Sequence, residues 1–255
     1  MEIQNTPVLG GTAPRHAWRT ANKLADFALR WCRAVEGASP EQRYLDVGCG
    51  NGFITELVAP CFDEVVGIDI EGERLGEFRA HTGGKSKFRI LEMSAARMEF
   101  PSNFFSCITS FEVLEHVTDV EATVREMARV CKPGGIIVIS VPQVWFPFEN
   151  HGARIGQRTF SCKIPILPYI RPLHRRYSLA RVFSSAEIDQ LFVSKRMKLL
   201  GTSYASPQFE RAAVQAHSWE SKLVFLAPFV GGCEKIPFLR ALSGVSLLKA
   251  YRKMT

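Results

Sequence analysis

Two acidic residues and a cluster of glycines have the types and spacing to bind a small organic ligand. Asp46 ends a short apolar run and is followed by Gly48, Gly50 and Gly52 in the stretch YLDVGCGNG, residues 44–52. Glycine permits positive φ angles and close backbone approach, so this cluster predicts a turn that passes close to something bound. Asp69 ends a second apolar run 23 residues after Asp46, at about the spacing where an acid holds ribose hydroxyls.

The two common phosphate-binding turns do not fit this stretch. A P-loop requires GxxxxGK[ST], and no lysine follows these glycines. A dinucleotide-binding turn requires GxGxxG, and its third glycine would fall at Phe53. A carboxylate beside a helix N-terminus would repel a pyrophosphate but suits a cationic amine. The ligand predicted here therefore carries a ribose and a positive charge, with no phosphate at this position.

The elements that must position these residues alternate between strand-like and helical stretches, which predicts a parallel sheet covered on both faces. Helical stretches are expected at 16–36, 51–59, 72–81 and 119–131. A further helix, in FSSAEIDQLFVSK, would be capped by Ser184 and Glu187. The expected strands are RYLDVG, EVVGIDI, KFRILEM, FFSCITSF and GIIVISVP, followed by the closing pair MKLLGTSY and GVSLLKAYRK.

Four motifs give the chain a family resemblance: LDVGCGNG, VVGIDI, FEVLEHV and RVCKPGGIIVISVP. Over residues 40–142, and again at FSSAEIDQLF, the chain resembles the class I S-adenosylmethionine (SAM)-dependent methyltransferases. It is most similar to the type 11 branch, which contains the ubiquinone and menaquinone methyltransferases. The resemblance implies a Rossmann-like, doubly wound α/β fold with a seven-stranded, mostly parallel sheet and an antiparallel last strand. It also implies SAM as the cofactor and S-adenosylhomocysteine (SAH) as its product.

We expect one methyltransferase domain over residues 1–255. Its parts would be an N-terminal helix in 1–40, a SAM-binding core in 41–142, a basic and aromatic insertion in 143–182, and C-terminal helices and closing strands in 183–255. The insertion, which follows the fifth strand, is expected to cap the substrate pocket. Its other interpretation is a solvated basic loop with a small core of its own.

The resemblance also assigns cofactor contacts. Asp46 and the backbone at Gly48, Cys49 and Gly50 would hold the methionine part of SAM, and Asp69 would hold its ribose hydroxyls. The adenine would meet Ile70, Ser94 and Ala95, and Phe111 is a further predicted cofactor contact. Ser94 departs from the family, which usually has Asp there. Since a neutral hydroxyl accepts a weaker hydrogen bond than a carboxylate, we expect loose SAM binding that Ser94→Asp would tighten.

Glu112, Glu115 and His116 in FEVLEH leave three interpretations open. They form ExxEH, which resembles the divalent-metal motif of the catechol O-methyltransferases of ubiquinone synthesis and would hold Mg²⁺ or Zn²⁺. Alternatively, His116 is a general base, with a pKa near neutrality. In the third interpretation Glu115 and His116 only pack beneath SAM. His151, just past the fifth strand, is a further candidate for catalysis or substrate binding, whereas His174 is expected at the surface.

The charges are divided unevenly along the chain. Residues 1–150 hold 15 Lys and Arg against 20 Asp and Glu, and residues 151–255 hold 17 against 5. This division predicts an acidic or anionic partner for the C-terminal half, such as an anionic acceptor or an anionic membrane surface touched peripherally. RNA is the other polyanion to consider, but the [ND]PP[YF] run of amino-methylating enzymes is replaced here by SFEVLE.

The function expected from these observations is methyl transfer from SAM, by in-line displacement, to an oxygen or carbon of a small hydrophobic or lipid-like acceptor. Alignment of the nucleophile would supply much of the rate. An RNA methyltransferase and a non-catalytic SAM-binding partner protein are the alternatives, and the intact glycines and aspartates argue against the second. Seven cysteines without a CxxC pair predict neither disulfides nor a zinc site, hence a reduced cytoplasmic protein. The longest apolar stretch, residues 223–232, is too short to span a membrane.

Overall fold

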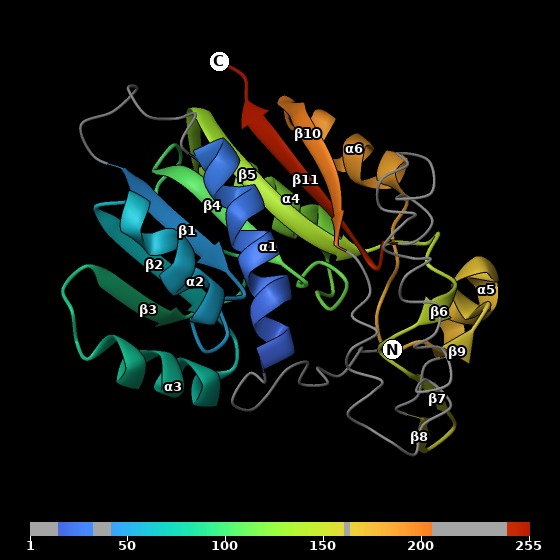
Figure 1. Ribbon diagram of the computed structural model, residues 1–255. Coiled ribbons are helices and arrows are strands. Elements are labelled where there is room, and N and C mark those ends of the chain that lie inside the picture. The colour runs from blue at the N-terminus through green and yellow to red at the C-terminus, as the bar shows by residue number, and fades with distance from the viewer. Residues whose placement is uncertain (1–14, 33–41, 161–163, 206–243) are drawn as a thin grey trace.

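The computed structural model describes residues 15–32, 42–160, 164–205 and 244–255, with the backbone alone for 15–20. One seven-stranded sheet, in the order β10-β11-β5-β4-β1-β2-β3, runs through it (Figure 1). Its strands are β1 (Arg43–Val47), β2 (Glu64–Asp69), β3 (Phe88–Glu92), β4 (Phe105–Phe111), β5 (Cys131–Pro142), β10 (Met197–Ala205) and β11 (Ser246–Lys253).

The sheet has the predicted topology. β1 pairs in parallel with β2 and β4, β2 with β3, and β4 with β5. The last strand, β11, runs antiparallel to both β5 and β10, so it lies one position inside the edge strand β10. The Rossmann-like α/β fold expected from the sequence is therefore confirmed, with its antiparallel last strand.

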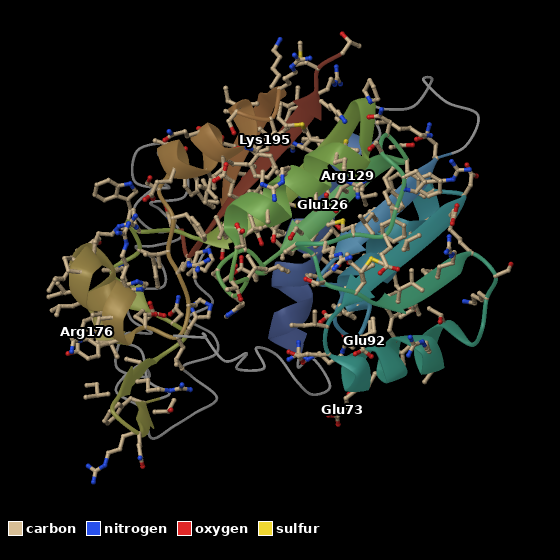
Figure 2. The ribbon with its side chains drawn as sticks, turned by 180° about the vertical axis from the view of Figure 1, so that it is seen from behind. Glu73, Glu92, Glu126, Arg129, Arg176 and Lys195 are labelled. Atoms are coloured by element: carbon tan, nitrogen blue, oxygen red, sulfur yellow. A yellow bond between two sulfur atoms is a disulfide. The ribbon has the colours of Figure 1, made fainter. Side chains whose placement is uncertain are left out.

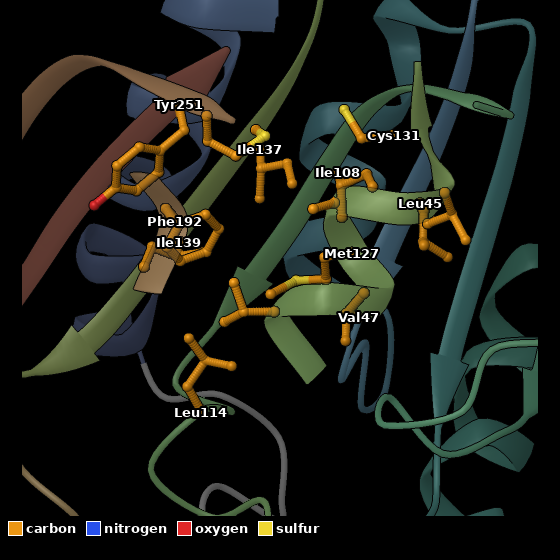
Figure 3. Close-up of a cluster of buried hydrophobic side chains, with 14 of the residues drawn as sticks. Leu45, Val47, Ile108, Leu114, Met127, Cys131, Ile137, Ile139, Phe192 and Tyr251 are labelled. Atoms are coloured by element: carbon orange, nitrogen blue, oxygen red, sulfur yellow. The ribbon is translucent and has the colours of Figure 1, made fainter. Parts of the chain in front are cut away.

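Helices cover both faces because the strands are apolar on both sides. α1 (Arg15–Cys32) and α2 (Phe53–Val58) pack on one face, and α4 (Val120–Val130) and α6 (Ser185–Val193) on the other (Figure 1). Side chains alternate accordingly along β1, where Tyr44 belongs to the first layer and Leu45 to the second. Figure 3 shows the second layer, in which Met127 of α4 and Phe192 of α6 meet the strands.

The predicted helices differ from the observed ones mainly at their ends. The stretch 51–59 is helical only from Phe53, because Gly52 is left-handed at the N-cap; the short 3-10 helix η2 (Ala59–Cys61) follows α2. α3 (Gly72–Thr82) lies beside β3. The capping box of α6 is confirmed, since the Ser184 hydroxyl accepts from the Glu187 N–H at 3.2 Å and the Glu187 carboxylate accepts from the Ser184 N–H at 2.7 Å.

The insertion after β5 forms a small unit beside the carboxyl end of that strand (Figure 1). It contains two two-stranded sheets, a 3-10 helix and the short helix α5. The bounds are β6 (Phe148–Glu149), β7 (Ala153–Ile155), β8 (Arg158–Phe160), β9 (Ile164–Pro165), η3 (Leu167–Tyr169) and α5 (Arg171–Tyr177).

The expectation that the chain has no disulfide is wrong for one pair. Cys32 at the end of α1 is bonded to Cys107 in β4, with their Cα atoms 6.1 Å apart. The two cysteines are 75 residues apart, so only the packing of α1 against the sheet brings them together. Residues 223–232 and His217 lie outside the described residues. Within the described part, no helix has the length and apolar character to cross a membrane.

The glycine turn between β1 and α2 is tied to β2. The N–H groups of Gly48 and Cys49 both donate to the Ile68 carbonyl, at 2.8 and 3.0 Å. Gly48 and Gly52 have φ angles of 75° and 82°. A Cβ added to Gly48 would lie 2.2 Å from a Val113 methyl group, and one added to Gly52 would lie 2.1 Å from the ring of Phe78. Packing therefore excludes any side chain at these two positions.

Gly52→Ala is expected to lower the free energy of unfolding by about 2–4 kcal/mol, since it combines left-handed strain with overpacking against Phe78. Gly83→Ala is the matched control. Gly83 also has a positive φ, 58°, but no atom lies within 4 Å of its added Cβ, so a loss of about 1 kcal/mol is expected. Urea denaturation measures both, and equal losses would contradict the packing role of Gly52.

Candidate active site

Gly50 is the glycine of the turn at which an added Cβ would meet no close packing. Its φ is 54°, and the nearest atoms to an added Cβ belong to the Arg74 side chain, at 3.8 Å and beyond. Unlike Gly48 and Gly52, it has no packed neighbour that explains the missing side chain. A bound ligand could therefore approach the backbone here.

Asp69, at the carboxyl end of β2, holds this turn in place. One of its oxygens accepts from the Gly50 N–H at 2.8 Å, and the other accepts from the Glu71 N–H at 3.0 Å. Each carboxylate oxygen has a second lone pair, so the half-buried group can still accept from a ligand hydroxyl. The structure thus joins the predicted ribose-binding acid directly to the glycine turn.

Asp46 is buried under the turn, with its side chain among hydroxyl groups. The Thr109 hydroxyl donates to one of its oxygens at 2.7 Å, and the Thr55 hydroxyl donates to the other at 2.6 Å. Burial raises the pKa of Asp46 to about 6, while these two hydrogen bonds oppose the rise. Asp46 therefore connects β1 to α2 and β4, and its contact with a ligand stays a prediction.

The other predicted cofactor contacts lie near the carboxyl ends of the strands or in the core. Ile70 follows Asp69 and is 51% exposed. Ser94 is exposed, and its hydroxyl accepts from the Ala96 N–H at 3.3 Å. Ala95 packs against the core layer under α4, and Phe111 is buried in the layer under α1. Their contacts with adenine stay predictions.

Sequence reasoning missed Arg74, which lies in the first turn of α3. Its Nε pairs with Glu71 at 2.7 Å, and one of its terminal nitrogens, Nη2, is buried without a hydrogen-bond partner in the described part of the chain. The other terminal nitrogen, Nη1, is the atom closest to the open side of Gly50. Nothing in the sequence distinguishes Arg74 from the other charged residues of α3, so its place beside Gly50 is seen only in the structure.

Glu112, Glu115 and His116 follow β4, as expected. Glu112 has a φ of 55°, which is unusual for a residue other than glycine, and its carboxylate accepts from the Ser140 hydroxyl at 2.7 Å. Glu115 is fully buried, and neither of its oxygens has a hydrogen-bond partner among the described residues. Burial, followed by the nearby Glu112 carboxylate, raises the pKa of Glu115 well above its usual range.

His116 and His151 meet edge to face, with ring centroids 5.4 Å apart. Burial lowers the pKa of His116 to about 4, with further contributions from His151 and Arg74, so this imidazole is neutral at pH 7. One donor atom each from Glu115, His116 and His151 lie within 4.8 Å of one another. The structure thus groups two members of the ExxEH motif with His151, while Glu112 bonds to Ser140.

Glu149 is a second residue that the sequence did not reveal. It is buried, and one oxygen accepts from the backbone N–H of His151 at 2.7 Å and lies 3.2 Å from its Nδ1. The other oxygen bonds to Nε2 of His174. Burial would raise the pKa of Glu149, but these histidine hydrogen bonds lower it to about 2. The expectation that His174 lies at the surface is wrong, because His174 is buried and bonds to Glu149.

Residues 45–139 match the family model described as a methyltransferase domain. Curated relatives include the ubiquinone biosynthesis O-methyltransferases of Bordetella bronchiseptica, 32% identical over 130 residues, and of Dechloromonas aromatica, 35% identical over 131 residues. Each alignment covers 50% of this chain and 54% or 55% of the relative. The chain therefore spans about half the length of the curated relatives it matches.

Two solved structures show the same fold. A SAM-dependent methyltransferase from Mesorhizobium loti has a TM-score of 0.57 and 18% identity over 90% of this chain and all of that one. The geranyl diphosphate C-methyltransferase of Streptomyces coelicolor A3(2) has a TM-score of 0.61 and 16% identity over 91% of this chain and 77% of that one. Residues 45–139 are therefore similar to a methyltransferase domain, and the described chain shares the fold of these two methyltransferases.

Proposed function

We propose that the protein is a methyltransferase that transfers the methyl group of SAM to an oxygen or carbon of a small hydrophobic or lipid-like acceptor. The observation that carries this proposal is the open backbone at Gly50, held by the Asp69 carboxylate within a methyltransferase fold. The matched relatives are named for ubiquinone biosynthesis and for geranyl diphosphate, which supports a small acceptor with apolar character.

The residues around Gly50 suit SAM. The open side of Gly50 leaves room for the methionine part, and Asp69 stands where the ribose hydroxyls would reach it. The buried, unpartnered Nη2 of Arg74 would gain a partner in the methionine carboxylate. Because SAM carries an activated methyl group, these residues need only bind it and align it with the acceptor.

Incubation with methyl-labelled SAM and cell extract, followed by partition between organic and aqueous phases, tests the activity. We expect label in the organic phase, and Asp69→Ala should lower the rate at least about tenfold through lost charged hydrogen bonds. Asp63→Ala is the matched control, because Asp63 also accepts a backbone N–H, from Gln42 at 2.9 Å, but precedes β2 at its opposite end.

Label confined to the aqueous phase would contradict the lipid-like acceptor, and its loss on nuclease treatment would favour the RNA methyltransferase. No SAM turnover with any fraction of the extract would favour a non-catalytic SAM-binding protein.

The Ser94 position bears on the affinity for SAM. Ser94→Asp is expected to lower the Kd for SAM about fivefold, because an exposed carboxylate there accepts a stronger hydrogen bond than the hydroxyl does. Calorimetry of wild-type protein, Ser94→Asp and the control Ser86→Asp, an exposed serine between α3 and β3, measures the change. An unchanged Kd in Ser94→Asp would count against the adenine contact.

We further propose that Glu115, His116 and His151 hold a divalent cation beside the acceptor. The observations that support it are the buried oxygens of Glu115 and the Nε2 of His116, none of which has a hydrogen-bond partner among the described residues. Glu149 takes Nδ1 of His151 as a hydrogen-bond donor, which leaves Nε2 of His151 with a lone pair for a metal. A cation bound here would acidify an acceptor hydroxyl. If a histidine acts as a general base instead, the lone pair on Nε2 of His151 or one on the neutral ring of His116 would accept the proton.

Titration of the protein with Zn²⁺, without SAM, tests the cation site. We expect His151→Ala to weaken binding more than about tenfold, as loss of even an outer partner of a metal site costs that much. His81→Ala, which removes an exposed histidine from the last turn of α3, should bind as the wild type does. Equal affinities in the two variants would overturn the cation site and leave the general-base role.

We also propose that the insertion touches an anionic membrane surface. Large apolar side chains are exposed along it, interleaved with arginines, as in segments that lie in a membrane interface. Two of the most exposed, at 58% each, are Ile155 and Ile166. The others are Trp145, Phe160, Tyr169, Ile170 and Leu173.

A further inference from the structure

The insertion and Glu187 of α6 line an open-sided cavity of about 910 Å³. Five arginines and one glutamate are among its lining residues. Such a volume lies within the range of small-molecule sites, about 300–1,000 Å³. The cavity is separate from the glycine turn, and none of the predicted cofactor contacts lines it.

Two of the five arginines already have partners. Arg171 pairs with Glu187 and donates to the Val182 carbonyl at 3.0 Å. Arg181 donates to the carbonyls of Val117 and Thr118, at 2.7 and 3.1 Å. Both side chains line the cavity, and Arg181 also links it to the loop between β4 and α4.

The other three arginines have little counter-charge in the described part of the chain, although Arg175 is close enough to Glu187 for their charges to interact. Arg154 of β7 and Arg175 and Arg176 of α5 form no ion pair with a described residue, and Arg176 only lies over the ring of Tyr177, at 5.6 Å. Figure 2 shows Arg176 beside α5, in the insertion. The only acid in the lining, Glu187, is already paired with Arg171. Five arginines gathered around one carboxylate repel one another, and an anion entering the cavity would relieve this repulsion.

The remaining walls add apolar surface and a buried histidine. Leu179, Val182 and Phe183 are buried and line the cavity, so its ligand would also carry an apolar part. His174 forms another wall and is bonded through Glu149 to the position of His151. A ligand in the cavity would therefore contact His174, which bonds to Glu149, the residue that also bonds to His151.

From these observations we infer that the cavity binds the phosphate or diphosphate group of an amphiphilic organic molecule. Arginine suits this group because its planar, forked guanidinium donates two hydrogen bonds to adjacent phosphate oxygens. Binding at this cavity needs neither SAM nor methyl transfer, so it goes beyond the proposed function.

Calorimetry with geranyl diphosphate at low ionic strength tests the site, with geraniol as the probe that lacks the diphosphate. We expect saturable binding of the diphosphate alone. The double variant Arg154→Gln with Arg175→Gln should bind at least about tenfold more weakly, because charged hydrogen bonds are lost. Arg158→Gln is the matched control, because Arg158 lies on β8 of the same insertion, is exposed, and is not among the lining residues.

Arg175 is exposed, so Arg175→Glu gives a second variant that should fold normally and lose binding still further. Thermal unfolding and SAM binding of all variants, measured beside the wild type, would show that the fold is intact. No saturable binding to the wild type, equal binding of geraniol, or equal loss in Arg158→Gln would overturn the site.

Sedimentation with vesicles of equal parts phosphatidylcholine and phosphatidylglycerol distinguishes the two sources of the phosphate. If the cavity takes a lipid headgroup, pyrophosphate will release the wild type from the vesicles and the double variant will not bind them. If it takes a free organic phosphate, the double variant will remain on the vesicles through the exposed apolar side chains while losing geranyl diphosphate. Either result supports a phosphate site, provided that calorimetry shows weaker binding of geranyl diphosphate by the double variant.

Discussion

The hydrogen bond from the Gly50 N–H to the Asp69 carboxylate, at 2.8 Å, fixes the geometry on which the site depends. It joins the turn after β1 to the end of β2. The second oxygen of Asp69 accepts a hydrogen bond from the N–H of Glu71, the N-cap residue of α3. Since β1 and β2 are parallel neighbours, both strands end at the same edge of the sheet. The acid and the open glycine therefore meet without any contribution from loops distant in sequence.

Three buried acids lie in this region, and two of them have hydrogen-bond partners. Asp46 has two hydroxyl donors, and Glu149 has two histidines. Glu115 has no hydrogen-bond partner in the described part of the chain. Because a buried carboxyl group without a partner is costly, Glu115 is the member of the site that most needs a ligand or a proton. Glu149 also connects the core to the insertion, since His151 and His174 both bond to it.

The sequence was sufficient to predict features whose cause is local. Alternating apolar and helical stretches predicted the sheet, and the spacing of glycines and aspartates predicted the turn and its acid. Contacts between distant segments were not predictable in the same way. Arg74 reaches Gly50 only because α3 folds back over the turn, and the Cys32–Cys107 bond depends on how α1 packs. Glu149 is likewise the buried partner of two histidines, one of which, His174, is 25 residues away in the sequence.

Calorimetric titration of SAH against wild-type and Gly50→Asn protein tests most directly whether the open glycine is the cofactor site. Asparagine tolerates the left-handed conformation of Gly50, and a Cβ there would make only ordinary van der Waals contacts with Arg74, so the fold should be retained. We predict that the wild type binds SAH and that the amide group, filling the ligand's place, abolishes binding while the unfolding temperature stays close to that of the wild type. Undiminished SAH binding in a folded Gly50→Asn protein would contradict the assignment.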